Sequence, residues 1–154
     1  MAEPFSLQPL VKLAQHQNDS ATRRLGQLNK QQQSAQEKLE TLQQYRKDYQ
    51  TRLQEATQSG ISQADLRNFQ QFISKIDEAI GQQLKQVEQS KVSTQTGRSE
   101  FDATQRKLKS FDTLQQRHIE EQKKVAEKSE QKALDEHTGR MAAYKMNNIE
   151  DQDK

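Results

Sequence analysis

Histidines, glycines and carboxylates are the residues with which this chain could bind a metal, hold a phosphate or transfer a proton. His16, His118 and His137 do not have the i, i+4 spacing with which a helix presents two imidazoles to one metal ion. The 5 glycines stand singly, whereas a phosphate-binding loop needs several glycines close together after a strand. The sequence therefore predicts neither a metal site nor a cofactor.

The composition also argues against thiol and acid–base catalysis. The chain has no cysteine, which excludes disulfides, thiolate metal sites and a cysteine nucleophile. Its 22 acidic residues could serve as proton donors only if one were desolvated in a concave apolar pocket, which would raise its pKa. A chain that is 30% hydrophobic lacks the conventional core that encloses such a pocket. We expect a protein that is not an enzyme and has no catalytic residue.

The charged residues almost balance, which limits the classes of partner. The 24 basic and 22 acidic residues leave a net charge of +2, far from the focused basic stripe of a nucleic-acid-binding protein. A membrane-spanning helix needs about 18 consecutive apolar residues, and a secretory signal needs a basic segment followed by an apolar run; the chain shows neither. We expect a cytoplasmic protein that neither binds nucleic acid nor inserts into a membrane.

The strongest pattern is a repeat of apolar residues at alternating steps of four and three. Between Leu7 and Ala56, 12 of the 15 positions on this repeat are apolar, although only 30% of the whole chain is hydrophobic. An unbroken heptad repeat of this length is typical of a coiled-coil seam. The pattern predicts one long helix over about residues 6–58.

The repeat stops at residues that are typical of a turn between two helices. Gly60 can adopt the left-handed conformation that ends a helix. Ser62 and Asp65 have the spacing of an N-cap and of the acidic residue at the third helical position. A loop as short as residues 59–61 makes the two helices antiparallel neighbours.

The repeat resumes in a second helix, expected over about residues 62–140. Ten of the 18 positions from Leu66 to Val125 are apolar, and half of the polar ones lie between residues 90 and 104. Because the chain folds back near residues 60 and 61, Gly97 should lie opposite Leu25 and its neighbour, where small residues allow a close approach of the two helices.

The predicted fold is all-α: two long helices in an antiparallel coiled-coil hairpin that forms a single domain over residues 1–154. Helix 1 runs out first, so that residues of helix 2 beyond about 120 have no partner within the chain. We therefore expect helix 2 to overhang. The polar residues that follow predict a disordered, flexible tail over residues 141–154.

One flank of the predicted hairpin is aromatic and the other is polar. In an antiparallel pair the g positions of both helices line one flank and the e positions line the other. Near the loop the g flank carries Tyr45 and Phe72 beside the seam residue Tyr49, which gathers three of the eight aromatic residues of the chain. Exposed aromatic patches concentrate binding energy, so we predict a partner-binding surface there, unless the rings only widen the seam. This aromatic patch consists of Leu42, Tyr45, Tyr49, Phe72, Ile76 and Ala79.

The sequence on both sides of the loop resembles that of the bacterial flagellar export protein family FliJ. The similarity covers most of residues 7–125 and includes Arg23-x-Leu25-Gly26. Its specific part is a paired motif around Gly60-Ile61, formed by Leu42-x2-Tyr45-x3-Tyr49, Asn68-Phe69-Gln70-Gln71-Phe72-Ile73 and Ala79-Ile80-x2-Gln83. At the edges of the aromatic patch, Lys38 and Gln83 depart from the Gln and His that the resemblance leads us to expect in some relatives.

The resemblance implies a non-enzymatic component of the flagellar type III export apparatus, cytoplasmic and peripherally associated with the inner membrane. Members look like the two-helix stalk of the rotary ATPase γ subunit. The resemblance implies that the end with the chain termini enters the hexameric ring of the export ATPase FliI. It also implies that the surface near the loop contacts the cytoplasmic region of the export gate protein FlhA, and that the protein escorts export chaperones. Gate binding maps onto the aromatic patch. Ring binding is expected at Leu10, Arg23, Leu25 and Leu114.

Three other functions fit parts of the sequence. An adaptor of the chaperone type would bind export substrates or substrate–chaperone complexes without entering a ring. A hairpin of the tRNA-clamping kind would use basic residues such as Arg106-Lys107-x-Lys109. A purely structural spacer would depend on the length of the helices and not on the aromatic patch.

Overall fold

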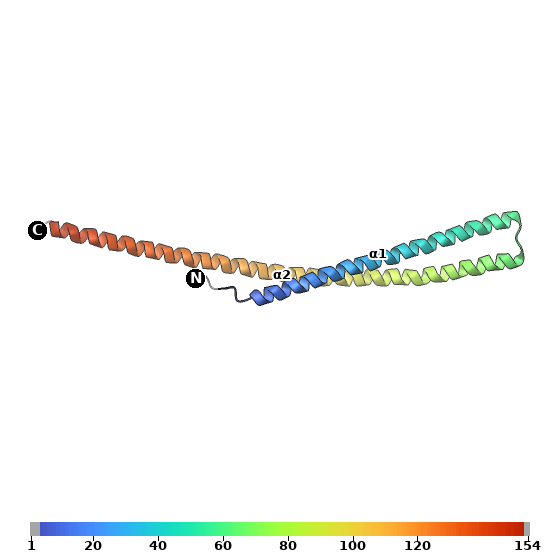
Figure 1. Cartoon of the computed structure of the whole chain (residues 1–154), viewed down its shortest axis with the longest axis horizontal. Coiled ribbons are helices and arrows are strands. Elements are labelled where there is room, and N and C mark those ends of the chain that lie inside the picture. The colour runs from blue at the N-terminus through green and yellow to red at the C-terminus, as the bar shows by residue number, and fades with distance from the viewer. Residues whose placement is uncertain (1–3, 153–154) are drawn as a thin grey trace. The chain divides into compact units, whose positions relative to one another are not determined.

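The computed structural model describes residues 4–152. Two helices account for nearly all of them: α1 spans Gln8–Ser59 and α2 spans Gln63–Gln152 (Figure 1). No strand occurs among the described residues. The all-α fold with two long helices is confirmed, and three of the four helix ends lie within two residues of the positions that the sequence predicts.

The connection between the helices uses the backbone chemistry that its residues predict. Gly60 has a φ of 88°, the left-handed conformation that favours glycine, and ends α1. Ser62 is the N-cap of α2, because its Oγ accepts a hydrogen bond from the backbone N–H of Asp65 at 3.2 Å. The backbone N–H of Leu66 donates to the carbonyl of Ser62 at 3.0 Å, which closes the first turn of α2.

Contacts divide the chain into two compact units, and the single domain that the sequence predicts over residues 1–154 stays a prediction. One unit is Ala14–Arg106, which contains the loop, and the other combines the residues up to Leu13 with those from Lys107 onward. In a two-helix hairpin, each residue contacts only residues at a similar position along the helix axis. No shared core therefore joins positions that are far apart along the axis.

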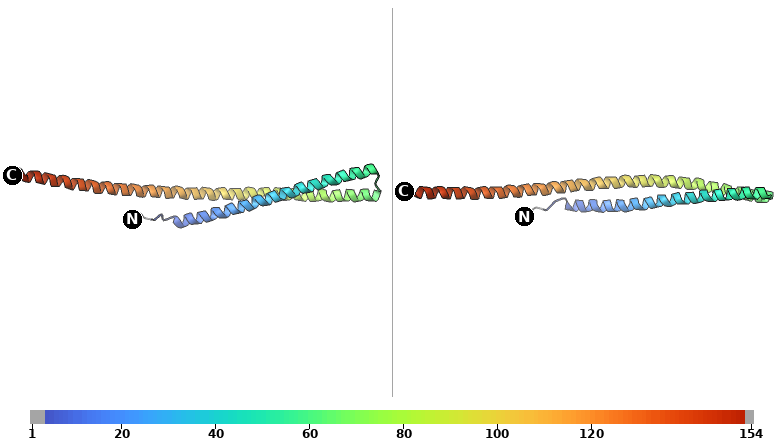
Figure 2. Two further views of the ribbon diagram at one scale, coloured as in Figure 1. Left: turned by 45° about the horizontal axis from the view of Figure 1, so that its top comes forward. Right: turned by 90° about the horizontal axis from the view of Figure 1, so that it is seen from above.

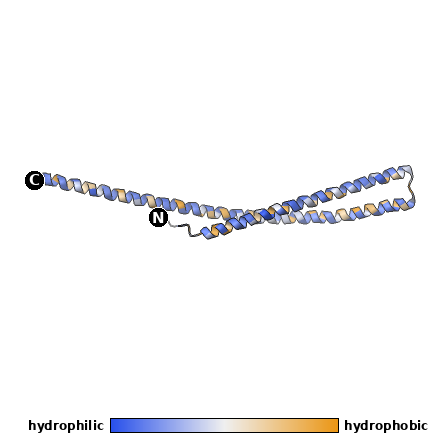
Figure 3. Cartoon of the chain, in the orientation of Figure 1, coloured by the Kyte–Doolittle hydropathy of each residue, from blue (hydrophilic) through white to orange (hydrophobic). Residues whose placement is uncertain are grey.

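The seam of the unit Ala14–Arg106 follows the predicted repeat position by position. From Ala14 to Ala56 and from Leu66 to Thr104, every residue on the repeat is buried or half-buried, and almost every residue off it is exposed. Figure 3 shows the hydrophobic residues as isolated bands on mostly hydrophilic helices. The two further views in Figure 2 agree that α1 and α2 lie side by side next to the loop. A narrow seam of this kind needs few apolar residues, which explains the low hydrophobic content.

The second unit pairs residues 4–13 with the first part of the α2 segment that begins at Lys107. Val11 is 3% exposed, and the rings of Phe5 and His118 lie 5.4 Å apart between centroids, tilted by 47°. Half-buried positions continue along the repeat as far as Gln122. Val125, which the repeat assigns to the seam, is 63% exposed, because none of residues 4–152 covers α2 from residue 123 to residue 152. The predicted overhang of the second helix is therefore present.

The end of the second helix differs from the prediction. α2 continues to Gln152, so that residues 141–152 are helical where the sequence led us to expect a flexible tail beginning at residue 141. This stretch contains neither glycine nor proline and begins with Met141 and two alanines, which are good helix formers. Extending an existing helix by one residue needs no new nucleus, so polar composition alone does not stop it.

Candidate partner-binding surface

Two aromatic rings meet across the seam near the loop and form the centre of the aromatic patch. Tyr49 on α1 and Phe72 on α2 have ring centroids 4.3 Å apart and an interplanar angle of 28°, a stacked arrangement. Phe69 approaches the same tyrosine edge-on, with centroids 6.3 Å apart and an angle of 62°. The predicted pairing of Tyr49 with Phe72 is therefore present, and the stack positions the patch relative to both helices.

The members of the patch differ in how much surface they offer to a partner. Tyr45 is 55% exposed and Phe72 is 44% exposed, so neither ring is enclosed in the seam. Leu42, Tyr49 and Ala79 are half-buried and border these rings. Ile76 is only 7% exposed, which places it in the floor of the patch and not on its accessible face.

A recess near the loop adds residues that the sequence reasoning assigned only to the seam or to the turn. It is open to solvent and has a volume of about 480 Å³. Its apolar lining comes from Tyr49, Ala56, Ile61, Phe69 and Phe72. A heptad pattern identifies which residues lie on a flank, but it does not show where the turn leaves space between them. The recess could receive one apolar side chain of a partner.

Arg52 is a further residue of this surface that the sequence reasoning missed. Its guanidinium carbon lies 5.4 Å from the ring centroid of Tyr49, within the range of a cation–π contact. The available signal is its spacing, because Arg52 follows Tyr45 by one heptad and therefore lies on the same flank. The contact adds a positive charge to the edge of the aromatic patch that lies toward the loop.

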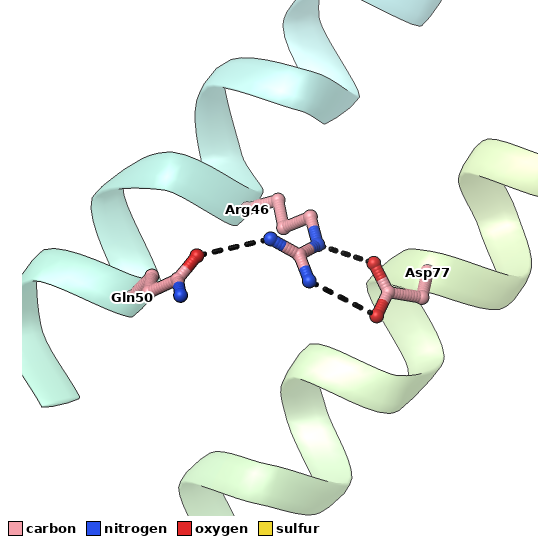
Figure 4. A network of polar contacts seen from close by, with 3 residues as sticks. All are labelled: Arg46, Gln50 and Asp77. Atoms are coloured by element: carbon pink, nitrogen blue, oxygen red, sulfur yellow. Dashed lines mark hydrogen bonds and ion pairs between the residues drawn. The ribbon is translucent and has the colours of Figure 1, made fainter.

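The opposite flank is closed by its own polar network. Arg46, a polar residue at a seam position, donates from Nε and Nη2 to the two carboxylate oxygens of Asp77 and from Nη1 to Gln50 Oε1 (Figure 4). The hydrogen bond from Arg46 and the charge of Asp77 together raise the pKa of Arg46 above its already high ordinary value. The two flanks therefore differ as predicted, and only one of them presents aromatic rings.

Several polar positions of the seam are hydrogen-bonded across the two helices. Gln83 is 8% exposed, and its Nε2 donates to the carbonyl of Ala35 at 2.9 Å. The hydroxyl of Thr94 lies 3.3 Å from the carbonyl of Leu28, and the side-chain amide of Asn18 donates to Thr104 Oγ1 at 3.1 Å. Such bonds remove the cost of burying a polar group and favour one register of the two helices.

Gly97 lies at a close contact between the two helices, opposite Leu25 as the fold-back predicts. A Cβ atom at this position would stand 2.5 Å from Leu28 Cδ1 and 3.8 Å from Leu25 Cδ1. The absence of a side chain at Gly97 is what allows Leu28 to pack against α2.

The four residues expected to bind an ATPase ring fall into the two units. Leu10 and Leu114 belong to the unit that contains the chain ends, and they are 46% and 41% exposed. Arg23 and Leu25 belong to the unit Ala14–Arg106. Arg23 is exposed, whereas Leu25 is half-buried and packs toward Gly97. Three of the four side chains are thus accessible to a partner.

Within residues 4–152, no helix is long and apolar enough to cross a membrane. The same residues contain no group of three or more histidine and acidic side chains placed to hold a metal ion.

Comparison with known proteins agrees with this picture. The family described as Flagellar FliJ protein matches residues 3–147. This chain belongs to the FliJ family. Two FliJ relatives, both named Flagellar FliJ protein, come from Escherichia coli (strain K12) and Salmonella typhi. Each is 30% identical to this chain over 145 residues, which cover 94% of this chain and 99% of the relative.

Membership of the FliJ family confirms the resemblance carried by the paired motif around the loop. It makes the chain a component of the flagellar protein export apparatus, and neither relative bears the name of an enzyme. The match extends over both helices, so the aromatic patch and the exposed end of α2 both lie within the family region as far as residue 147.

Proposed function

We propose that this FliJ-family chain is the stalk that connects the export ATPase to the export gate of the inner membrane. The unit that holds Leu10 and Leu114 enters the hexameric ring of the export ATPase FliI and promotes its assembly and activity. The aromatic patch binds the cytoplasmic region of the gate protein FlhA, and export chaperones dock on the same stalk. The protein works in the cytoplasm, at the periphery of the inner membrane.

The exposure of Tyr45 and Phe72 is the observation that carries the gate-binding role. Tyr45 is 55% exposed and Phe72 is 44% exposed, in a chain that has only 8 aromatic residues. Leaving these rings in water costs the hydrophobic stabilisation that burial would provide, and a partner that covers them recovers it. The stack on Tyr49 holds the ring of Phe72 in place, so covering this ring costs little side-chain entropy.

The end of α2 supports the ring-binding role. Every residue from 123 to 152 is exposed, yet several of these residues are large and hydrophobic. They are Val125, Leu134, Met141, Tyr144, Met146 and Ile149. A helix that has no partner in its own chain and carries such residues is suited to insertion into another protein.

The same exposed residues suit a second function, that of an adaptor which binds export substrates or substrate–chaperone complexes without entering a ring. The two functions differ in one measurable consequence. A stalk raises the turnover and the hexamer formation of the isolated ATPase, whereas an adaptor changes neither.

A pull-down with the ATPase and the cytoplasmic region of the gate protein tests the proposal. The triple variant Tyr45→Ala, Tyr49→Ala, Phe72→Ala should lose the gate protein, because hot-spot residues cost about 2 kcal/mol or more each when truncated. It should retain the ATPase, whose expected contacts lie elsewhere, and circular dichroism should show the helical content of the wild type.

Two further variants separate binding from stability. Gln36→Ala, Gln43→Ala, Gln70→Ala changes the opposite flank near the loop and should retain both partners. Tyr45→Ala alone removes a ring that is 55% exposed, so it should weaken gate binding without lowering the melting temperature. Unfolding of the Tyr45→Ala protein, or undiminished gate binding by the triple variant, would overturn the assignment.

A further inference from the structure

A shallow groove continues from the aromatic patch along the same flank, away from the loop. It has a volume of about 730 Å³ and is lined by residues of both helices, beginning with the patch residues Leu42 and Ala79. Beyond them its lining is mainly glutamine and serine, including Gln31, Ser34, Gln82, Gln86, Gln89 and Ser93. The groove is thus a polar extension of an aromatic surface.

The groove carries a single charge. Lys38 is its one charged lining residue, and no carboxylate lines it, although 30% of the chain is charged. Glu100 pairs with Arg24 and Asp77 pairs with Arg46, so neither carboxylate compensates Lys38. Among the residues that the structure describes, the side chain of Lys38 makes no hydrogen bond or ion pair. Its charge is therefore available to an anionic group of a partner.

Four glutamines of the groove have side chains with free hydrogen-bonding capacity. The carboxamides of Gln31, Gln82, Gln86 and Gln89 make no hydrogen bond to any residue between 4 and 152, whereas that of Gln83 donates to the carbonyl of Ala35. Each carboxamide offers both donors and an acceptor. An extended peptide presents unpaired backbone N–H and C=O groups that need such partners, whereas a helix has already paired its own. The lining therefore suits an extended segment.

We propose that the partner bound at the aromatic patch continues along this groove as an extended segment with an acidic residue opposite Lys38. The inference rests on the proposed function, because it takes the gate protein as that partner. Lys38 and Tyr49 are 11 residues apart on α1, or about 16 Å along the helix axis. An extended chain covers this distance in about five residues. The acidic residue therefore lies about five positions from the apolar side chain that contacts Tyr49.

Charge reversal at Lys38 tests the inference with the full-length chain and the cytoplasmic region of the gate protein. Calorimetry at low ionic strength should show Lys38→Glu binding about three- to tenfold more weakly than wild type, since an attractive charge pair becomes repulsive. The difference should shrink at high salt, because exposed charges are screened. Lys47→Glu makes the same change of charge on the same helix outside the groove and should bind like wild type.

Crosslinking locates the partner segment. Because the chain has no cysteine, Gln86→Cys can carry a photo-crosslinker as the only labelled site. We expect it to capture a gate-protein segment that contains an acidic residue about five positions from an apolar one, and reversal of that acidic residue to lysine should restore the affinity for the Lys38→Glu protein.

The outcomes separate this inference from the proposed function. Unchanged binding by Lys38→Glu, or equal losses for Lys38→Glu and Lys47→Glu, contradicts the groove and leaves the gate-binding role intact. Capture of a second copy of this chain by the label on Gln86→Cys would make the groove a self-association surface and also contradict it. If the wild-type chain does not bind the gate protein, the proposed function is wrong and the groove inference falls with it.

Discussion

Gly97 and Gly81 show how one residue type has opposite roles at two positions of the same helix. A Cβ atom at Gly97 would lie 2.5 Å from Leu28 Cδ1, whereas a Cβ atom at Gly81 would have nothing within 4 Å. In an open helix interior, alanine is more favourable than glycine by about 1 kcal/mol. At Gly97 this gain is opposed by the rotamer change that Leu28 must make to avoid the new methyl group.

We expect Gly81→Ala to raise the free energy of unfolding by about 0.5–1 kcal/mol and Gly97→Ala to lower it or leave it unchanged. The two variants should therefore differ by about 0.5–2 kcal/mol in urea denaturation followed by circular dichroism. Equal stabilisation by both would mean that Leu28 can move without cost, and the close approach of the helices at Gly97 would not constrain the chain.

The helices themselves were predictable because a heptad repeat encodes both their existence and the face they bury. Asn18, Arg46 and Gln83 interrupt the apolar pattern, yet each lies in the seam and is paired by a hydrogen bond to the other helix. Spacing alone placed these residues correctly, but it could not identify their bonding partners, since the partner depends on the relative shift of the helices and on side-chain rotamers.

The candidate surface was predictable to the same extent. The g positions identified Tyr45 and Phe72 as exposed rings, and the fold-back paired Tyr49 with Phe72. The roles of Phe69 and Arg52 depend on how their side chains turn toward Tyr49, which no periodicity encodes. The end of α2 was misjudged for a different reason: polarity was read as disorder, although residues 141–152 favour a helix.

The N-cap of α2 offers a test at the scale of the element. Ser62→Ala removes the hydroxyl that accepts the N–H of Asp65, and we expect a loss of about 1 kcal/mol in the free energy of unfolding. Ser74→Ala, at an exposed position inside the same helix, serves as the control and should be neutral or slightly stabilising. A Ser62→Ala protein as stable as the wild type in urea would show that the start of α2 does not limit stability.

At the scale of the whole molecule, the aromatic patch and the exposed part of α2 belong to different compact units, while two of the four expected ring contacts, Arg23 and Leu25, share the unit of the patch. The aromatic patch and its groove lie within Ala14–Arg106, and the exposed part of α2 lies within the other unit. No residue of the described chain covers residues 123–152, which are all exposed. They therefore contribute little to the stability of the paired helices. A change there should affect one function and leave the other unchanged.

Leu134, Met141 and Tyr144 provide the means to test this separation without shortening the chain. Their spacings of seven and three place them on one face of α2, and they are 60%, 50% and 66% exposed. The variant Leu134→Gln, Met141→Gln, Tyr144→Gln keeps good helix formers at these positions while removing the apolar face. We expect it to bind the gate protein within twofold of wild type and to lose most of the stimulation of ATPase turnover, because hydrophobic burial drives insertion into a ring. Full stimulation by this variant would exclude the apolar face as the ring contact, and a parallel loss of gate binding would contradict the independence of the two units.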